Sequence, residues 1–465
     1  MENTHIETQD THSDRKDATP SKLVRGIGKI IFTGIGIIVT LLVLEGLARL
    51  AGFKKDQGLE PAGYYSYSEQ SGYDITPNFR EFTQTFEGVK ITYKSNDIGC
   101  FDADVGVVDS VAAANSKQTS KPILLVGDSF TWGFTPFEHK WGTKLEDYTG
   151  NRVLKCGVNG YGTKQELVKA ENVIEKTKTD PSLIVVGYFF NDFTNDYLSP
   201  STIAYDGRLV TKNIFKDVTT GEIDSFSDQK VAERYAYYEK YCHTFEPKNA
   251  FMMRIACYMK KHSIFYPYVK DAGKNFLTSI FGKEYYGNLV TADDPLQNET
   301  EYLPLVPTKT YPWLAAAWKD HLNSIAAFQK LARAHHSKLL VVLIPDKTMV
   351  YPGLAADAKA KVPTIDYGAA QKRLHDFLNQ KGIMYDDLID DFVTHAKTSP
   401  DFETKVLLDN VNDLYWRYDG HWNPKGNELA GLLVSKFVLE HKLLPANADF
   451  PTKLEAVNAS LAGFK

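Results

Sequence analysis

The chain has 465 residues, of which 43% are hydrophobic and 24% are charged, and its formal net charge is −5. This length exceeds one typical domain and allows a sizeable core. Lysine and arginine are scattered, so the chain has no basic footprint and nucleic acid is excluded as an expected partner. Aromatic residues, 12% of the chain, are dense between about residues 188 and 316, and we interpret them as core rather than as sugar-stacking groups.

The amino-terminal part predicts a membrane anchor. Residues 1–20 are polar without an apolar period, which predicts a disordered cytoplasmic tail. Residues 21–53 contain an uncharged run with apolar flanks, long enough as a helix to cross about 30 Å of bilayer. Lys22, Arg25 and Lys29 precede this run, which favours a cytoplasmic amino terminus and an extracytoplasmic catalytic part, periplasmic in a Gram-negative cell. A cleaved signal peptide is the alternative, but no Ala-x-Ala site follows, so we prefer an uncleaved signal anchor.

Four cysteines are few for a disulfide framework in a chain of this length. Cys156 lies in an apolar strand and is interpreted as a buried packing residue, whereas Cys242 and Cys257 could pair in an exported domain. Cys100 has no assigned partner. Neither the cysteine spacing nor the adjacent histidines at 335–336 match a zinc site, so no metal is predicted.

Residues 60–120 predict a β-hairpin segment followed by a linker. Residues 81–86 and 90–94 alternate apolar and polar side chains around a Glu-Gly pair, which is a hairpin signal. The Asn-x-x-Gly segment at residues 96–99 predicts a turn, and residues 103–120 have the composition of a linker.

From residue 121 the chain alternates strand and helix patterns, which is typical of an α/β domain with a parallel sheet covered by helices on both faces. We place this domain at residues 121–445. Its five strands are predicted at residues 123–126, 152–157, 183–188, 338–344 and 383–388. Helices are predicted at residues 164–178, 313–336 and 426–441. The expected fold is therefore a three-layer sandwich with a five-stranded parallel sheet.

Residues 195–312 separate the third and fourth strands and exceed a normal crossover connection, which indicates an insertion. Its amphipathic segments at 231–242 and 250–262 and its aromatic clusters at 264–269 and 285–286 fit a lid over a site or a structural embellishment equally well. Residues 446–465 are assigned to a carboxyl-terminal tail.

Ser129 lies in a short polar turn directly after the first apolar strand of the domain. Gly127 allows a sharp turn before it and Gly133 a close approach after it. Open α/β sheets place ligands and reacting groups at the carboxyl ends of such strands. The alternative is that Asp128 and Ser129 only cap the next helix.

Three later motifs supply the partners that a nucleophilic serine needs. The four motifs in chain order are Gly127-Asp128-Ser129, Asn159-Gly160-Tyr161-Gly162, Asn191-Asp192 and Asp419-Gly420-His421. Together they resemble the SGNH (GDSL) hydrolase superfamily, over about residues 121–445 with gaps. The resemblance implies a flavodoxin-like SGNH fold with an N-terminal transmembrane helix and a long insertion added to it.

A serine hydroxyl needs a base within hydrogen-bond reach, and His421 is the candidate because it follows Asp419 in a turn before a helix. Asp419 would fix the imidazole tautomer and favour the imidazolium that forms during attack. The family more often has Asp-x-x-His. The Asp-x-His spacing here, with Trp422 after it, is similar to membrane-anchored alginate and cell-envelope O-acetyltransferase-like proteins.

The resemblance also implies an oxyanion hole made by the backbone N–H groups of Ser129 and Gly160 and the side-chain amide of Asn191. Gly157 and Gly162 are nearby alternatives to Gly160. Two further acids, Asp128 and Asp192, are interpreted as framework hydrogen-bond acceptors.

One lysine lies at the carboxyl end of the fourth predicted strand. Lys347 follows Asp346 there, and a lysine at this edge could attract an anionic substrate or pair with its neighbour. We expect the pair with Asp346.

These features predict a membrane-anchored extracytoplasmic serine esterase or O-acyltransferase that forms an acyl-serine intermediate and needs no cofactor. The expected substrate is an ester, and more narrowly an acetylated envelope glycan; the expected membrane contact is the N-terminal helix, and no protein partner is identified. A catalytically silent SGNH-like subunit of a membrane assembly is the main alternative, and a glycan-binding module using the aromatic insertion is another.

Overall fold

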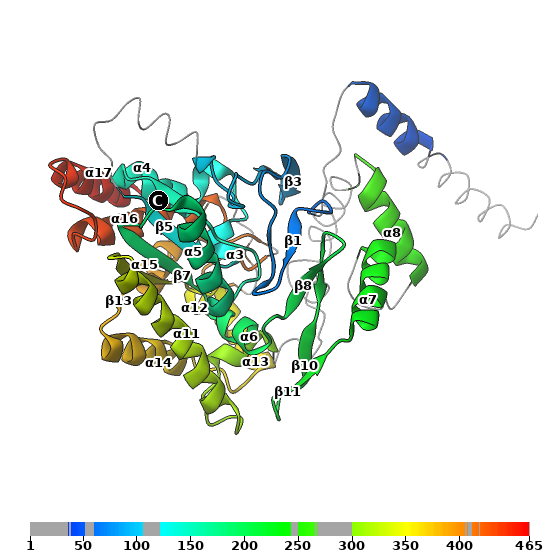
Figure 1. Ribbon diagram of the computed structural model, residues 1–465. Coiled ribbons are helices and arrows are strands. Elements are labelled where there is room, and N and C mark those ends of the chain that lie inside the picture. The colour runs from blue at the N-terminus through cyan, green and yellow to red at the C-terminus, as the bar shows by residue number, and fades with distance from the viewer. Residues whose placement is uncertain are drawn as a thin grey trace, which may run out of the picture. The chain divides into compact units, whose positions relative to one another are not determined.

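The computed structural model describes residues 36, 39–51, 60–105, 121–242, 250–264, 266, 300–404, 407, 412–417 and 419–464 (Figure 1). The chain divides into two units. The smaller unit comprises Met1–Lys55 and Ser263–Phe265, and the larger comprises Asp56–His262 and Tyr266–Lys465.

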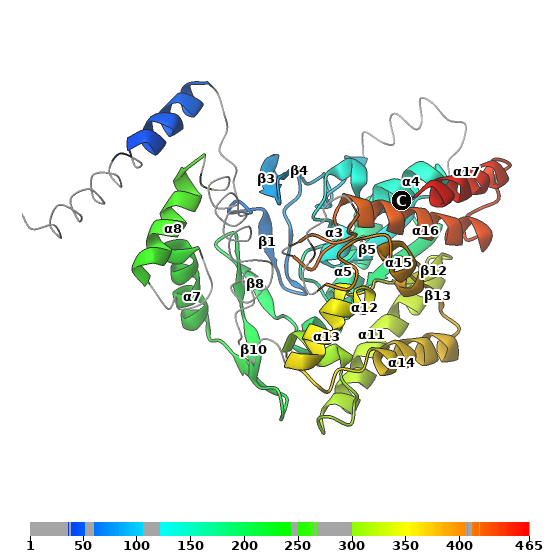
Figure 2. The same ribbon diagram turned by 180° about the vertical axis from the view of Figure 1, so that it is seen from behind.

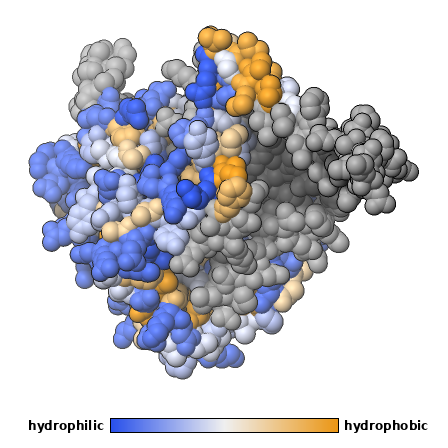
Figure 3. All heavy atoms as spheres, turned by 90° about the vertical axis from the view of Figure 1, so that its right-hand side faces the viewer, coloured by the Kyte–Doolittle hydropathy of each residue, from blue (hydrophilic) through white to orange (hydrophobic). Residues whose placement is uncertain are grey.

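The described part of the smaller unit is a helix over residues 39–50 with exposed apolar side chains, among them Leu42 and Leu50 (Figure 3). Its Glu45 carboxylate accepts hydrogen bonds of 2.9 Å from the Ser263 hydroxyl and the Ile264 N–H. No helix in the described residues is long and apolar enough to cross a bilayer. The predicted tail, and most of the predicted anchor at residues 21–53, lie outside the described residues.

A five-stranded parallel sheet forms the centre of the larger unit, as predicted (Figures 1 and 2). Its strands, in spatial order, are β13 (Met384–Asp387), β12 (Lys338–Leu343), β7 (Leu183–Tyr188), β5 (Ile123–Gly127) and β6 (Val153–Lys155). Every neighbouring pair is parallel. Counted in chain order this is 2-1-3-4-5, the flavodoxin-like order, in which ligands bind where the order reverses, between the first and third strands. Those strands are β5 and β7.

The apolar run of β5 is buried because helices cover both faces of the sheet. Leu124 and Val126 belong to one apolar cluster, and Ile123 and Leu125 to the other. The first cluster includes side chains of α5 (Thr163–Thr177), α11 (Leu314–Ala334) and α14 (Tyr367–Lys381). The second includes side chains of α4 (Trp141–Thr149), α15 (Ile389–Ala396) and α16 (Pro424–Glu440). The predicted three-layer arrangement is therefore present.

Short elements at the carboxyl edge of the sheet and beyond complete this domain. They are α3 (Ser129–Trp132), η1 (Phe137–His139), α6 (Asp192–Tyr197), η2 (Leu303–Leu305), α12 (Lys347–Val350) and α13 (Pro352–Lys361). Residues 446–465, assigned to a tail from the sequence, contain α17 (Phe450–Gly463), whose Val457 is fully buried in a cluster with Leu432 and Leu439 of α16.

Two hairpins precede the sheet. The predicted one is β3 (Phe82–Phe86) with β4 (Val89–Tyr93), and an unpredicted one is β1 (Tyr65–Ser68) with β2 (Gly72–Ile75). Their aromatic side chains pack on the α3 turn: Tyr93 stacks on Trp132 with ring centroids 4.6 Å apart, and Trp132 Nε1 donates to Tyr64 Oη at 3.0 Å. The hairpin segment is thus part of the wall around Ser129.

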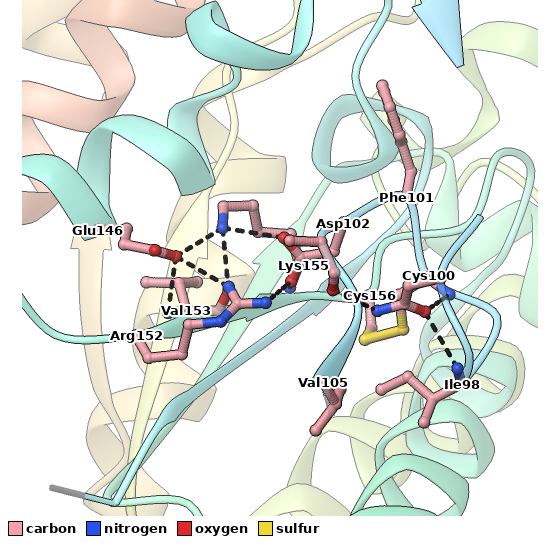
Figure 4. A network of polar contacts seen from close by, with 12 residues as sticks. Ile98, Cys100, Phe101, Asp102, Val105, Glu146, Arg152, Val153, Lys155 and Cys156 are labelled. Atoms are coloured by element: carbon pink, nitrogen blue, oxygen red, sulfur yellow. Dashed lines mark hydrogen bonds and ion pairs between the residues drawn. A yellow bond between two sulfur atoms is a disulfide. The ribbon is translucent and has the colours of Figure 1, made fainter. Parts of the chain in front are cut away.

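A disulfide and a buried ion network fasten this segment to β6 (Figure 4). Cys100 and Cys156 are disulfide-bonded, which corrects the interpretation of Cys156 as only a packing residue. Beside it, Lys155 Nζ lies 3.1 Å from Asp102 Oδ1, and both side chains are almost fully buried. Arg152 also binds Asp102, at 2.6 Å. These cations hold the pKa of Asp102 below its usual value although burial by itself would raise it.

The insertion begins with two hairpins, β8 (Thr202–Tyr205) with β9 (Arg208–Thr211) and β10 (Asn213–Asp217) with β11 (Glu222–Ser225). Helices α7 (Asp228–Tyr241) and α8 (Ala250–His262) follow side by side (Figures 1 and 2). They are joined by the disulfide Cys242–Cys257, a pairing that the sequence left open. Most of the predicted aromatic clusters at 264–269 and 285–286 lies outside the described residues.

Replacing Asp102 by asparagine tests the buried network. The buried Lys155 ammonium would then keep only Glu146 as a counter-charge, at 2.6 Å, so we expect the free energy of unfolding to fall by about 3 kcal/mol. Urea denaturation of the folded chain measures this. Glu222→Gln removes the exposed pair with Lys216 and should leave the value unchanged. An equal effect of the two substitutions would contradict the role given to Asp102.

Candidate active site

Three glycines at the carboxyl edge of the sheet make room for the α3 turn. A Cβ on Gly127 would lie 2.2 Å from Thr131 Oγ1, and one on Gly187 would lie 2.4 Å from the same atom. A Cβ on Gly157 would lie 2.4 Å from the Trp132 backbone nitrogen. Since such distances do not occur between real atoms, side chains at these positions would displace the turn that carries Ser129. Gly157, one alternative for the oxyanion hole, therefore has a packing role.

The structure brings Ser129, His421 and Asp419 together. His421 Nε2 lies 2.7 Å from Ser129 Oγ, and His421 Nδ1 is hydrogen-bonded to Asp419 Oδ1. The imidazole is held between two aromatic rings, Phe130 at 4.9 Å and Phe134 at 4.3 Å between centroids. Ser129 itself is only 4% exposed. This is the geometry of a serine with an adjacent base and a carboxylate that orients the base.

A tight turn lets the aspartate of the short Asp-x-His motif reach the histidine ring. Asp419 Oδ1 accepts from the backbone N–H of His421 at 2.8 Å as well as from its ring. The backbone N–H of Trp416 donates to His421 O at 3.0 Å, and Asn423 caps α16 by accepting from Gly426. Trp422 is buried beside Phe130, with ring centroids 5.1 Å apart. The residue next to the histidine therefore anchors the turn in the core.

Lys347 binds the backbone of Asp419 instead of pairing with Asp346 as the sequence suggested. Its ammonium donates to the backbone oxygen of Asp419 at 2.8 Å, whereas Asp346 Oδ1 accepts from the N–H and hydroxyl of Thr348, at 2.7 and 2.5 Å. The expected Lys347–Asp346 pair is wrong. Burial would raise the pKa of Asp419, but the charge and hydrogen bonds of His421, with Lys347 nearby, outweigh it and lower the pKa to about 2. Asp419 is thus an anion at neutral pH.

The loop that contains Gly160 approaches the site at the end of β6. Gly160 has a φ of 79°, in the left-handed region that favours glycine, and a Cβ there would lie 2.9 Å from the Tyr73 hydroxyl. Tyr73 Oη donates to Asn159 O at 2.7 Å, so β2 of the unpredicted hairpin holds this loop. Gly162, the other alternative to Gly160 as an oxyanion donor, is the N-cap of α5. A Cβ there would lie 2.8 Å from Asp196 Oδ1.

Asn191 follows β7, on the other side of the switch point from Gly160. Its side chain does not cap α6 but lies near the buried Asp128 carboxylate and helps to lower the pKa of that carboxylate. An amide carries two N–H groups, so this side chain can donate to a bound oxygen. Asn191 also lines the cavity described below. The three predicted donors thus lie on the loops that end β5, β6 and β7.

Asp128 lies next to the nucleophile at the start of the α3 turn. It caps α3 by accepting from the Phe130 N–H at 2.9 Å, as the capping alternative proposed, and it lies 3.2 Å from Ser129 Oγ. Ser129 does not cap the helix. Burial raises the pKa of Asp128 to about 6, against the lowering effect of these hydrogen bonds and of His421. The framework role predicted for Asp128 and Asp192 agrees with these contacts, since Asp192 Oδ2 accepts from the Phe189 N–H at 3.2 Å.

Acidic residues that the sequence reasoning missed lie behind the site. Glu166 is fully buried and neither of its oxygens has a hydrogen-bond partner in the described structure. Burial, with the nearby carboxylates adding, raises the pKa of Glu166 and of Asp192 well above their usual values. Asp196 binds His321 Nδ1 at 2.8 Å. Glu166 shares the buried face of α5 with Ala170, so a charged residue within an apolar helical stripe was the available signal.

A cavity of about 340 Å³ opens beside His421 and Asn191. Its lining comprises Phe130, Phe189, Phe190, Asn191, Thr194, Asn195, Thr300, Glu301, Tyr302, Leu305, Asp346, Gly420 and His421. This volume suits a small ligand. Within the described ranges, no group of three or more His, Cys, Asp or Glu side chains could hold a metal ion.

Comparison with known proteins gives distant likenesses only. No family model and no curated protein matches the chain. A solved structure from Bacteroides fragilis, provisionally assigned as an acylhydrolase, is 14% identical with a TM-score of 0.30, over 73% of this chain and 97% of its own. A GDSL-like lipase from Bacteroides thetaiotaomicron is 12% identical with a TM-score of 0.27, over 72% and 97%. An acetyl xylan esterase is 10% identical with a TM-score of 0.28, over 68% and 99%.

At these identities and TM-scores, the chemistry of the site must be argued from its own geometry.

The raised pKa of Asp128 predicts a pH-dependent effect of Asp128→Asn. The folded state favours the protonated carboxyl, so this contribution to stability is fully present below the unfolded pKa of about 3.9 and is lost as the pH rises through about 6. Between pH 4, just above the unfolded pKa, and pH 8 the variant should gain about 2 kcal/mol relative to the parent chain. Urea denaturation at both pH values measures it. Asp390→Asn, at an exposed carboxylate, is the control; a pH-independent difference for Asp128→Asn would contradict the assignment.

Proposed function

We propose that the protein is a serine esterase or O-acyltransferase that acts through an acyl-serine intermediate on Ser129. The observation that carries this proposal is the 2.7 Å contact between His421 Nε2 and Ser129 Oγ, with the opposite ring nitrogen bound to an ionised Asp419. With Nδ1–H donating to the carboxylate, Nε2 is left to accept the serine proton.

In the first half-reaction Ser129 Oγ attacks the ester carbonyl carbon while its proton passes to His421 Nε2. The tetrahedral intermediate then collapses, the C–O bond to the alcohol breaks, and the imidazolium returns a proton to the leaving oxygen. In the second half-reaction water or a sugar hydroxyl gives its proton to His421 and attacks the acyl-serine. Ser129 recovers its proton when the product acid or ester leaves.

Negative charge on the carbonyl oxygen is stabilised by the N–H groups of Ser129 and Gly160 and by the Asn191 amide. None of the described hydrogen bonds uses either backbone N–H, so both are left as donors.

The alternative of a catalytically silent subunit keeps the fold without the chemistry. A silent chain has no need to maintain the Ser129–His421 contact, the tight turn at Asp419 and the packing of the imidazole between two aromatic rings. This combination favours an enzyme.

The finer part of the proposal is a membrane-anchored, extracytoplasmic enzyme that acts on an acetylated envelope glycan. Two disulfides, Cys100–Cys156 and Cys242–Cys257, support an oxidising compartment. The charge pattern before the apolar run at the amino terminus supports the orientation. Hydrolysis and transfer share the first half-reaction, and the acceptor present at the second decides between them.

A serine-reactive fluorophosphonate probe tests the activated nucleophile in the detergent-solubilised full chain. We expect labelling of the parent protein and of His441→Ala, at an exposed histidine that follows the last residue of α16, and none of Ser129→Ala or His421→Ala. An unlabelled but folded parent protein would favour the silent subunit, and persistent labelling of Ser129→Ala would place the nucleophile elsewhere.

Asn191→Ala tests the oxyanion hole separately. Removing one donor that acts mainly on the developing oxyanion should lower kcat for an acetyl ester about 10²- to 10³-fold with little change in KM. Steady-state kinetics measure this, and Asn379→Ala on the outer surface of α14 should retain the parent values. An effect confined to KM would show that Asn191 binds the ground state instead.

A further inference from the structure

The cavity beside His421 is lined by both aromatic rings and carboxylates. Phe130, Phe189 and Phe190 form part of the wall next to the candidate nucleophile, and the Phe130 and Phe189 rings are 4.5 Å apart. Tyr302, near the carboxyl end of the insertion, adds a fourth aromatic side chain. The cavity reaches both Asn191 and His421, so a ligand in it would adjoin the reacting carbonyl.

Two carboxylates, Glu301 and Asp346, line this cavity. Its lining includes no lysine or arginine. The nearest candidate cation, Lys347, donates to the backbone oxygen of Asp419 instead of entering the lining. Neither carboxylate takes part in a direct ion pair within the described part of the chain, although the charges of Lys347 and Lys361 act on Glu301 from farther away and offset part of the rise in its pKa. The fixed charge presented to a ligand is therefore negative.

The Asp346 carboxylate is built into the site. It caps α12, and its Oδ1 accepts both the N–H and the hydroxyl of Thr348, which fixes the carboxyl group at the end of β12. Glu301 is exposed, but the surrounding chain still removes part of its hydration and raises its pKa, and the neighbouring Asp346 adds to this effect. The two groups thus act on the same space.

We propose that this cavity binds the alcohol part of an acyl ester whose sugar is uncharged or positively charged, and that Glu301 and Asp346 exclude anionic sugars. This inference rests on the proposed function and names its substrate class. Aromatic rings favour the apolar faces of a sugar and the ammonium of an amino sugar. A uronate would instead bring a third negative charge into a partly dehydrated space, with no cation in the lining to pair with it.

Matched esters that differ only in charge test the proposal. The substrates are mono-O-acetyl esters of methyl glucoside, methyl glucosaminide and methyl glucuronide, with p-nitrophenyl acetate as a separate report on Ser129. We expect kcat/KM for the glucuronide to be at least about tenfold below that for the glucoside, as a like charge within about 8 Å predicts after screening. The glucosaminide should match or exceed the glucoside.

The double variant Glu301→Gln/Asp346→Asn removes both charges. Asparagine keeps an oxygen for the Thr348 hydrogen bonds, so the cap on α12 is retained. The glucuronide-to-glucoside ratio should rise about tenfold towards one. Glu171→Gln, an exposed carboxylate on α5 outside the cavity lining, is the matched control and should leave the ratio unchanged. An unchanged ratio in the double variant would overturn the proposal.

Binding measurements test the charge selection independently of the proposed chemistry. In the Ser129→Ala chain, titration calorimetry with the unacetylated methyl glycosides should give the same order of affinity, with the glucuronide binding most weakly. The double substitution should raise the affinity for the glucuronide to that for the glucoside. If the parent chain does not hydrolyse p-nitrophenyl acetate but this binding order is found, the proposed function is wrong and the charge selection still holds. Turnover with equal binding of all three glycosides would defeat the charge selection alone.

Discussion

The close packing of the α3 turn on three glycines is the constraint from which the rest of the site follows. Gly127, Gly187 and Gly157 end three neighbouring strands or lie just beyond them, and Cβ atoms at these positions would collide with the turn. Ser129 can therefore emerge directly at the switch point between β5 and β7, where the loops carrying Gly160 and Asn191 also end. One packing arrangement thus fixes the nucleophile and the candidate oxyanion donors together.

Electrostatics divide the acids around this turn into two kinds. Asp419 is kept ionised because His421 and Lys347 face it, which suits a carboxylate that must stabilise an imidazolium. Asp128, Glu166 and Asp192 are buried with few donors, so their pKa values are raised. Asp128, with a pKa of about 6, is still mainly ionised at neutral pH. The stronger rise in pKa at Glu166 and Asp192 favours their protonated forms, which add less negative charge near the developing oxyanion. The buried acids therefore fit a framework role.

Local sequence patterns predicted the elements that depend on local causes. The alternation of strand and helix patterns predicted the five strands, and four short motifs pointed to Ser129, Gly160, Asn191, Asp419 and His421. Contacts between distant segments were harder to foresee. The Cys100–Cys156 disulfide depends on how the hairpin segment lies on β6, and Lys347 reaches Asp419 across 72 positions of the chain. Its neighbour Asp346 was the obvious local partner, but capping of α12 already occupies that carboxylate.

The most direct test of the central claim is to trap the acyl-enzyme and locate it. The full chain would be mixed rapidly with an acetyl ester, quenched in acid and analysed by peptide mass spectrometry. The account predicts one acetyl group per chain, on Ser129, at a level that rises when Asp419→Asn slows the second half-reaction more than the first. Acetyl groups on another residue, or turnover of the ester with no adduct on Ser129 at any quench time, would contradict it.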